Sequence, residues 1–453
     1  MTDKTKLSPI TSIGWAIGEL AIAAFVVIQM AYMLYYCTEA LHIPPALAGL
    51  ALMIPRLLDA FADPLMGSIS DRTKNRFGRR RLFLLIGAPF LGLSLALVFF
   101  VPPDINQNLK IIILLTTFLL SNAAVTIYEV PYSAMAAEMT GSYKERTTLA
   151  GYKMLAARLG GVIAAFAAPK IFGSTPDLDY GFRILGVSCG IFMCFTGLWA
   201  FFATKNAPQT TCKIKIFSLS EEIAAVKNNQ SFRKLWSAFF IQNLAIGAQA
   251  TALIYFIVQV IQISPKDAGQ FMSSGAIAAL IATPIWVLIG KKIGKKNGYY
   301  FGIIGSLILA IPALFLGHGQ AQYLLLILII AGFTDAATQL FPNAMVPDTV
   351  EADELKTGLR REGAIFGAWG FARKLGMTGG AFIVSQLLAL IHFKSGVNPS
   401  LQPPEVILGI RMIYVILPSI LWAIAFFALM KYDLSEDKFE QIKREINSQK
   451  GDN

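Results

Sequence analysis

The stretch RLLDAFADPLMGSISDRTKNRFGRRR, residues Arg56–Arg81, places two aspartates and an arginine inside an apolar segment and ends in a cluster of cations. Charged side chains are costly at membrane depth, so those found there usually pair with one another or form a site for an ion or substrate. Clusters of Lys and Arg are typical of cytoplasmic loops between membrane helices. The stretch therefore predicts a membrane helix with a functional site, followed by a cytoplasmic loop.

The composition of the whole chain agrees with this interpretation. Of 453 residues, 55% are hydrophobic and only 15% are charged, whereas soluble domains carry about 25% charged residues. Apolar stretches of about 18 residues or more, long enough to cross a bilayer, recur along the chain. The net charge of +11 comes from loop cations, so nucleic-acid binding is not expected. The four cysteines and three histidines lack metal or redox spacing, which predicts no disulfide framework and no metal site.

The spacing of the apolar stretches predicts twelve membrane helices in an all-α membrane protein, because lipid offers no partners for backbone polar groups. We expect them at residues 13–38, 45–70, 81–101, 109–138, 148–173, 181–204, 232–262, 267–290, 298–316, 321–347, 362–393 and 405–431. A polar connection, 205–231, divides them six and six. The basic loop after the second helix recurs after the eighth as GKKIGKKNG. These features predict two pseudo-symmetric six-helix bundles, 1–204 and 232–431.

The loop cations predict the orientation in the membrane. Loops after the even-numbered helices are rich in Lys and Arg, whereas opposite loops such as CTEALHIPP and GSTPDLDY are nearly free of them. By the positive-inside rule, the basic loops and both termini are cytoplasmic. The first apolar segment is a full-length span, so no cleavable signal peptide is expected. The charged tail, 432–453, is expected to be solvated.

Asp59 and Asp63 are spaced i, i+4, so both carboxylates share one helix face, and Arg56 lies one turn earlier on the same face. Two close carboxylates do not both stay ionised in a low dielectric without a cation. Two acids and one base leave one charge to be balanced. This favours a site for a coupling cation, H⁺ or Na⁺, with Arg56 as the resident partner. The alternative is an ion pair between Arg56 and one aspartate that joins two helices.

Glu129 lies in VTIYEVPYSAM, where Thr126 shares its helix face and Pro131 frees a backbone carbonyl one turn earlier. Glu129 and Thr126 are candidates to add oxygens to the cation site or to bind a polar substrate. The alternative is that Glu129 pairs with Lys153 or Arg158 across a kinked helix.

Glu19 and Lys374 are further charges inside apolar segments. Glu19 either accepts hydrogen bonds from a substrate or forms a salt bridge with a cation of the fifth helix. Lys374 is expected to face the cavity and to pair with Asp59 or Glu129, whereas Arg373, about 100° away around the helix, extends toward the interface.

Three motifs in register carry a family resemblance. DAFADPLMGSISDRT with GRRR, YEVPYSAMAAEMTGSYKERTTLAGYK and PNAMVPDTVEADELKTGLRREGAIFGAWGFARKLG resemble the glycoside–pentoside–hexuronide:cation symporter family. This is the melibiose-permease-like branch of the major facilitator superfamily, and the similarity spans the chain. The resemblance implies the major facilitator fold and cation-coupled uptake by alternating access.

The resemblance also implies roles for residues of this chain. The cation site would comprise Asp59, Asp63, Thr126 and Glu129. The substrate site would comprise Glu19, Glu129, Tyr132, Lys153, Arg158 and Lys374. Five positions depart from the melibiose-type pattern: Ala62 replaces an asparagine beside the second aspartate, Ser133 replaces a sugar-stacking tryptophan, Gly18 replaces a lysine, and Glu19 and Glu129 replace two sugar-contacting aspartates. The loss of the asparagine favours protons or weakens sodium binding, and the other four changes argue against a galactoside specificity.

The sequence therefore predicts a secondary symporter of the bacterial inner membrane that imports a small polar solute, most simply a sugar or glycoside. A cytoplasmic gate is expected at Asp71, Arg72 and Arg79. One alternative keeps the fold and carries a lysophospholipid or another amphiphile, and another is a non-transporting membrane sensor. No enzyme activity and no cofactor beyond the coupling ion are expected. The expected partners are the solute, a monovalent cation and the lipid bilayer, and the protein is expected to be monomeric.

Overall fold

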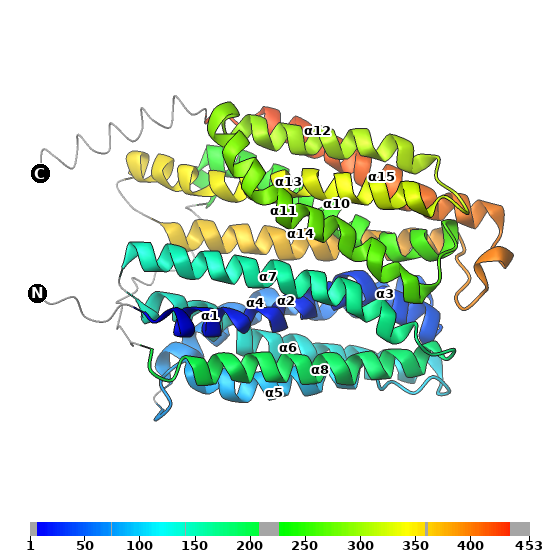
Figure 1. The fold of residues 1–453 in the computed structure, drawn as a ribbon, viewed down its shortest axis with the longest axis horizontal. Helices are drawn as coiled ribbons and strands as arrows, with labels where there is room; N and C mark the ends of the chain where they lie inside the picture. Colours follow the sequence, from blue (N-terminus) through cyan, green and yellow to red (C-terminus); the bar gives the residue numbers. More distant parts are fainter. Residues whose placement is uncertain (1–6, 74, 141, 208–225, 358–360, 435–453) are drawn as a thin grey trace, which may run out of the picture. The chain divides into compact units, whose positions relative to one another are not determined.

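The computed structural model describes residues 7–73, 75–140, 142–207, 226–357 and 361–434, and every regular element in these ranges is helical (Figure 1). The α-helices of the first half are α1 (Pro9–Ile17), α2 (Glu19–Val27), α3 (Met33–Tyr35), α4 (Pro45–Arg72), α5 (Arg81–Val98), α6 (Gln107–Met139), α7 (Tyr143–Phe172) and α8 (Leu178–Ala203). Those of the second half are α10 (Gln230–Tyr255), α11 (Ala268–Ile293), α12 (Lys295–Leu314), α13 (Ala321–Thr357), α14 (Glu362–Leu390) and α15 (Pro404–Met430). Short π-helical segments are η1 (Ile28–Tyr32), η2 (Tyr36–Ala40) and η3 (Phe256–Val260). Two 3₁₀ turns are η4 (Pro265–Asp267) and η5 (Pro399–Leu401).

All twelve predicted spans are helical. In the described part of the chain, ten helical segments are long and apolar enough to cross a membrane, and the two bent halves of α4 make an eleventh. The remaining predicted span is α14, a helix of 29 residues. Most of the predicted middle connection and of the charged tail lies outside the described residues.

Helix α4 bends by 40° between Asp59 and Ala62. Pro55 and Pro64 lie inside the helix, and a proline removes one helical hydrogen bond and crowds the preceding turn. The bend therefore falls at the acidic pair that the sequence singled out.

The described residues form two compact units. The first contains 1–214, 257–273 and 385–406, and the second contains 215–256, 274–384 and 407–453. The predicted division into two six-helix bundles stays a prediction.

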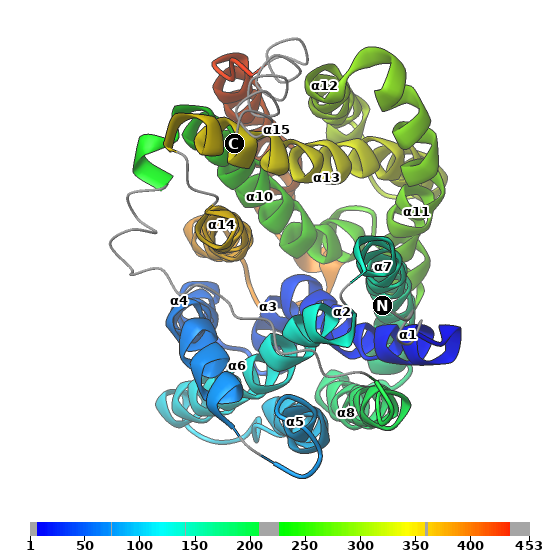
Figure 2. The ribbon, with the colours of Figure 1, turned by 90° about the vertical axis from the view of Figure 1, so that its left-hand side faces the viewer.

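In the first unit, α5 lies between α6 and α8 (Figure 2). Two glycines let α5 and α8 approach closely: a Cβ atom on Gly92 would lie 2.3 Å from the carbonyl oxygen of Gly190, and one on Gly190 would lie 2.5 Å from that of Gly92. Small residues at such crossings are typical of membrane helices, whose association depends on close van der Waals packing. The lipid side of the same helices is apolar, with Leu93 61% exposed and Ile191 66% exposed.

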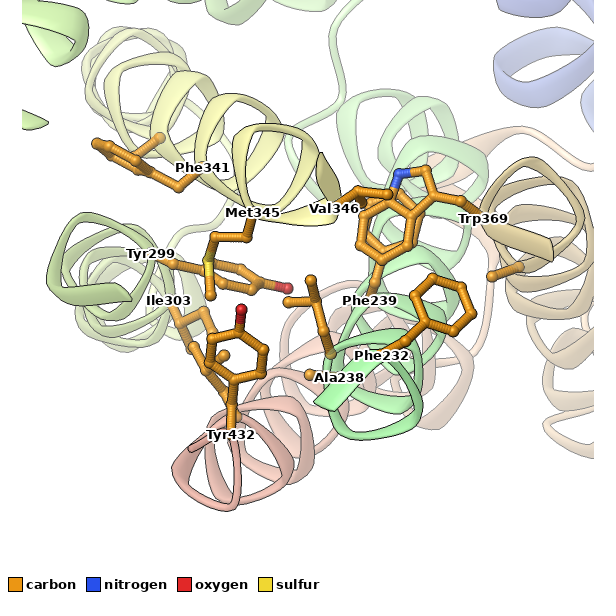
Figure 3. Close-up of a cluster of buried hydrophobic side chains, with 14 of the residues drawn as sticks. Phe232, Ala238, Phe239, Tyr299, Ile303, Phe341, Met345, Val346, Trp369 and Tyr432 are labelled. Atoms are coloured by element: carbon orange, nitrogen blue, oxygen red, sulfur yellow. The ribbon is translucent and has the colours of Figure 1, made fainter. Parts of the chain in front are cut away.

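In the second unit, buried aromatic side chains of α10, α12, α13 and α14 form one cluster (Figure 3). The ring of Phe239 stacks on that of Trp369, with centroids 3.7 Å apart and planes 10° apart. The indole nitrogen of Trp369 donates a hydrogen bond of 2.9 Å to the side-chain oxygen of Asn343, as a buried indole requires. The cluster holds three helices of this unit in fixed register.

Candidate functional site

Helices α4 and α6 bring together three of the predicted cation-site residues. The hydroxyl of Thr126 donates a hydrogen bond to Asp59 Oδ1 and lies 3.4 Å from Asp63 Oδ1. Thr126 is buried and both aspartates are half-buried. The i, i+4 spacing on α4 thus aims both carboxylates at one hydroxyl of α6. These three side chains supply five oxygen atoms that can hold a small cation.

Arg56 lies one turn before Asp59 and has its own partners. One terminal nitrogen of its guanidinium, Nη2, donates to the side-chain oxygen of Gln29 at 3.1 Å, and the other, Nη1, contacts the sulfur of Met30 at 3.2 Å. The guanidinium carbon lies 6.0 Å from the centre of the Phe118 ring. Asp59 also acts on Arg56 electrostatically. Arg56 therefore supplies a fixed positive charge beside the acids, and the three ionised groups together carry one net negative charge.

Lys153 on α7 joins α2 and α6 through its ammonium group. Its nitrogen lies 3.6 Å from Glu19 Oε2 and donates a hydrogen bond of 2.8 Å to the hydroxyl of Ser133. It also lies 5.4 Å from the centre of the Tyr132 ring. Of the two interpretations of Glu19, the structure therefore contains the salt bridge, and its partner is Lys153.

Tyr132 is fully buried. Its ring stacks on that of Trp15 with centroids 4.9 Å apart, and its hydroxyl donates a hydrogen bond of 3.0 Å to the Trp15 carbonyl. The ring of Tyr128 also stacks on that of Tyr132, with centroids 5.6 Å apart, so no face of the Tyr132 ring is exposed and its contact with a substrate stays a prediction. Trp15 was not predicted as a site residue, although its i, i+4 spacing to Glu19 is a usable signal.

Gly18 is tightly enclosed. A Cβ atom there would lie 2.5 Å from the hydroxyl oxygen of Tyr128 and 2.9 Å from the side chain of Ala200. The Tyr128 hydroxyl lies 3.4 Å from the Gly18 carbonyl oxygen, to which it donates. Packing around Tyr128 therefore explains the absence of the lysine that melibiose-type carriers have at this position.

The remaining predicted substrate residues are spread over three helices. Glu129 is half-buried on α6 and forms no ion pair or hydrogen bond with the described residues. Arg158 is half-buried on α7. Lys374 is half-buried on α14 and belongs to the second unit, so its pairing with Asp59 or Glu129 stays a prediction.

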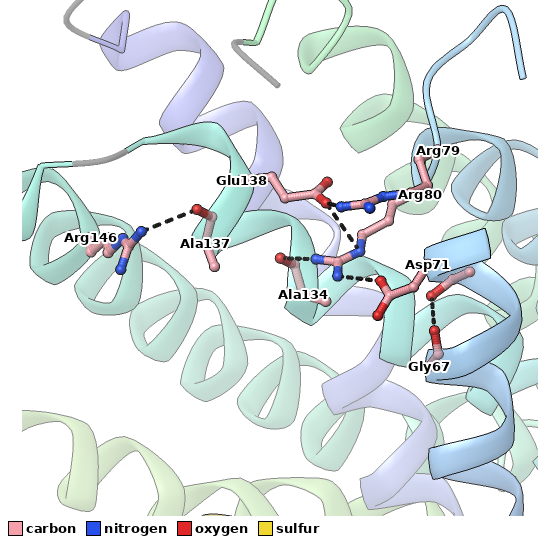
Figure 4. Close-up of polar contacts among 9 residues, drawn as sticks. Gly67, Asp71, Arg79, Arg80, Ala134, Ala137, Glu138 and Arg146 are labelled. Carbon is pink, nitrogen blue, oxygen red and sulfur yellow. Dashed lines mark hydrogen bonds and ion pairs between the residues drawn. The ribbon is translucent and has the colours of Figure 1, made fainter. Parts of the chain in front are cut away.

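The predicted gate residues lie in a network of charges at the end of α4 (Figure 4). Asp71 pairs with Arg80 at 2.6 Å, and Arg79 pairs with Glu138 at the end of α6. The Nε atom of Arg80 lies 3.6 Å from the same Glu138 carboxylate. Asp71 is thus tied within its own unit, and Arg72 is exposed.

Arg80 and Glu138 were not among the predicted gate residues. Arg80 is 5% exposed, and its guanidinium also donates to the Ala134 carbonyl. The second unit has a similar contact, in which Lys295 at the start of α12 donates to Asp348 of α13 at 2.7 Å. In the sequence, Glu138 stands three residues after Met135 and Asp348 three residues after Met345. This shared spacing is a signal that could have paired the two contacts.

Comparison with known proteins gives the family of the chain. The model of the family "MFS/sugar transport protein" matches residues 14–436. A putative glycoside/cation symporter of Escherichia coli (strain K12), YagG, is 27% identical and aligns over 98% of this chain and 95% of its own length. The glucuronide carrier protein homolog of the same organism is 27% identical over 98% of this chain and 97% of its own.

A solved structure shares the fold. The inward-facing, unoccupied bacterial homologue of the human lysosomal transporter Spinster gives a TM-score of 0.70 at 13% identity, and the match covers 94% of this chain and 98% of that one. Together with the apolar helices, these matches establish an integral membrane protein that is a transporter and not an enzyme. The chain belongs to the MFS/sugar transport protein family.

Proposed function

We propose that this protein is a cation-coupled symporter that imports a sugar or glycoside across the bacterial inner membrane by alternating access. The observation that carries the proposal is the arrangement of Asp59 and Asp63 around the hydroxyl of Thr126. The printed names of the glycoside/cation symporter and the glucuronide carrier homolog support the class of solute.

The cation site consists of Asp59, Asp63 and Thr126, with Glu129 as a further ligand. A monovalent cation neutralises the net negative charge that Arg56 leaves on the acidic pair, which lowers the cost of holding two carboxylates at membrane depth.

The coupling ion is a proton. A proton needs only one carboxylate oxygen, whereas sodium needs several oxygen ligands around it. Ala62 offers no side-chain oxygen beside Asp63, so sodium has one neutral ligand fewer, which favours the proton.

The solute site is centred on Glu19 and Lys153, and its further members are the predicted residues Glu129, Tyr132, Arg158 and Lys374. Charged groups form strong hydrogen bonds with sugar hydroxyls. The ammonium nitrogen of Lys153 lies 3.6 Å from Glu19 Oε2, beyond hydrogen-bond length, and the solute inserts its hydroxyls between the two groups.

Helix α6 couples the two sites. It carries Thr126, which binds the acidic pair, and Ser133, which binds Lys153. A cation that changes the hydrogen bond of Thr126 therefore acts on the same helix that positions the solute partners. By linkage, the solute raises the affinity for the cation by the same factor as the cation raises the affinity for the solute.

The bundles 1–204 and 232–431 move relative to each other around the connection 205–231, and both termini face the cytoplasm. The gate network of Asp71, Arg79 and Arg80 fixes the cytoplasmic end of α4 to α6 during this movement.

Uptake into proteoliposomes tests the proposal. An imposed inward proton gradient is expected to drive accumulation of methyl β-glucoside or a methyl glucuronide, and a protonophore is expected to abolish it. Sodium-driven uptake that survives the protonophore contradicts the choice of ion. Uptake of a labelled lysophospholipid, with no uptake of either glycoside, contradicts the choice of solute.

A further inference from the structure

A cavity of the first unit is lined by none of the residues of the acidic pair. Its volume is about 860 Å³, and it is lined by the end of the first predicted span, the segments 173–178 and 258–265, and the loop 396–400. All of these segments belong to the same compact unit. The volume lies within the range of about 300–1,000 Å³ that is usual for small-molecule sites.

The cavity is built on a repeated turn. Residues 36–45, YCTEALHIPP, and residues 256–265, FIVQVIQISP, both begin as π-helices. In each, the seventh residue has a positive φ, 53° at His42 and 61° at Gln262. The amide of the eighth residue donates to the carbonyl of the second at 2.9 Å and 3.1 Å, respectively. π-helical turns and left-handed non-glycine residues both concentrate at functional sites.

The repeat places one buried acceptor group on each side of the cavity. Glu39 is 9% exposed and Gln259, at the equivalent position, is 1% exposed. The Glu39 Oε2 atom accepts a hydrogen bond of 3.3 Å from the Gly396 amide. The Oε1 atoms of both residues are buried and accept no hydrogen bond from the described residues. Buried acceptors without donors cost free energy, so both groups are poised for a ligand that donates hydrogen bonds.

The other lining side chains define the kind of ligand. Among the described residues that line the cavity, Glu39 alone carries a formal charge. His42, Gln262, Asn398 and Ser400 add further hydrogen-bonding groups. One carboxylate repels an anion, and the described residues contain no group of acids and histidines that could hold a metal ion. The volume also far exceeds that of a single monovalent ion.

We propose that this cavity is a second binding site, which takes an uncharged polyhydroxylated solute through Glu39 and Gln259. Gly396 shapes it, because a Cβ atom at this position, whose φ is 71°, would lie 2.5 Å from the His42 ring. The side of the membrane on which the cavity lies rests on the proposed function, whose predicted topology places the cavity on the face opposite the cytoplasm. There it acts as a vestibule that collects solute before transport.

Thiol protection measures occupancy without requiring transport. Ser264 lines the cavity and its hydroxyl makes no capping hydrogen bond, so Ser264→Cys places a reporter thiol there. Methyl β-glucoside is expected to slow its reaction with a membrane-impermeant maleimide, with the wild-type chain giving the background of the native cysteines. Glu39→Gln, which keeps an acceptor for Gly396, and Gln259→Leu are each expected to raise the half-protecting concentration about tenfold, as loss of one good hydrogen bond does.

Glu405→Gln is the matched control, because Glu405 is an exposed acid that does not line the cavity. It is expected to leave protection unchanged. Protection that is absent, equal in all variants or as strong for a methyl glucuronide as for the neutral glucoside overturns the proposal and leaves a cavity that holds water only.

The two proposals fail separately. The vestibule predicts that Glu39→Gln raises the KM for uptake from the outside but not the KM for efflux. Normal glycoside uptake without protection contradicts the vestibule alone. Protection without uptake of any glycoside contradicts the proposed function alone.

Discussion

Thr126→Val removes the hydroxyl that joins the acidic pair while keeping the shape of the side chain. The hydroxyl donates to Asp59 and lies 3.4 Å from Asp63. Hydrogen bonds to charged groups contribute about 1.5–3 kcal/mol. Both carboxylates are half-buried, so the lower end of that range applies. The substitution therefore destabilises the ionised form of the pair by about 1.5 kcal/mol.

The sign of the effect distinguishes the two ions. A donor stabilises the ionised carboxylates, so its removal makes the pair hold a proton more tightly. Since about 1.4 kcal/mol corresponds to one pH unit, the pH of half-maximal uptake is expected to rise by about one unit. If sodium were the coupling ion, the lost hydroxyl would be a lost ligand. The sodium concentration for half-maximal uptake would then rise about tenfold.

The assay is initial uptake of a labelled glycoside into proteoliposomes over a series of external pH values, at fixed membrane potential. Thr126→Ser is the control, because serine keeps the hydroxyl and is expected to follow the wild-type profile. A valine variant whose pH midpoint coincides with that of the wild type contradicts the role of the Thr126 hydroxyl in stabilising the ionised pair. So does a serine variant that shifts as far as the valine variant.

Two further substitutions test the packing and the gate. Gly190→Ala pushes a methyl group toward the carbonyl of Gly92 and is expected to destabilise the protein by about 1–3 kcal/mol through overpacking. Its thermal unfolding temperature in detergent should therefore fall. Gly151→Ala is the control, because its methyl group meets no atom within 4 Å and should leave the unfolding temperature unchanged. Arg80→Gln is expected to slow uptake several-fold without lowering expression, because it disconnects α4 from α6, whereas the exposed Arg72 tolerates the same change; equal rates in both variants would argue against the gate.

The parts of the site that depend on local spacing could be predicted from the sequence. Asp59 and Asp63 share a face because a helix repeats every 3.6 residues, and the structure does aim both at α6. The helical fold and the family were likewise predicted and are confirmed. In each case the pattern lies within one helix or recurs along the whole chain.

Contacts between distant helices could not be predicted in the same way. Lys153 binds Ser133 across 20 residues, and the carbonyl of Trp15 accepts the Tyr132 hydroxyl across 117. Such pairs depend on the rotation and axial position of two helices, which are set by packing on all sides. Sequence alone therefore left the salt bridge of Glu19 as one of two equal alternatives.

The vestibule was missed for a different reason. The segment around Glu39 was interpreted only as a loop poor in cations, because its apolar pattern stops there. The match between residues 36–45 and 256–265 is one of backbone conformation more than of identity, since the acid of the first turn becomes Gln259 in the second. The two segments share their π-helical start and the positive φ of their seventh residue.

Concentrative uptake by the Asp59→Asn, Asp63→Asn double variant, with solute exchange at zero gradient measured on the same vesicles, tests whether the acidic pair couples the ion to the solute. We expect accumulation against a gradient to be abolished while exchange and membrane expression persist, because the variant binds solute but no longer binds the driving ion. Accumulation that persists at the wild-type level in the double variant would contradict it.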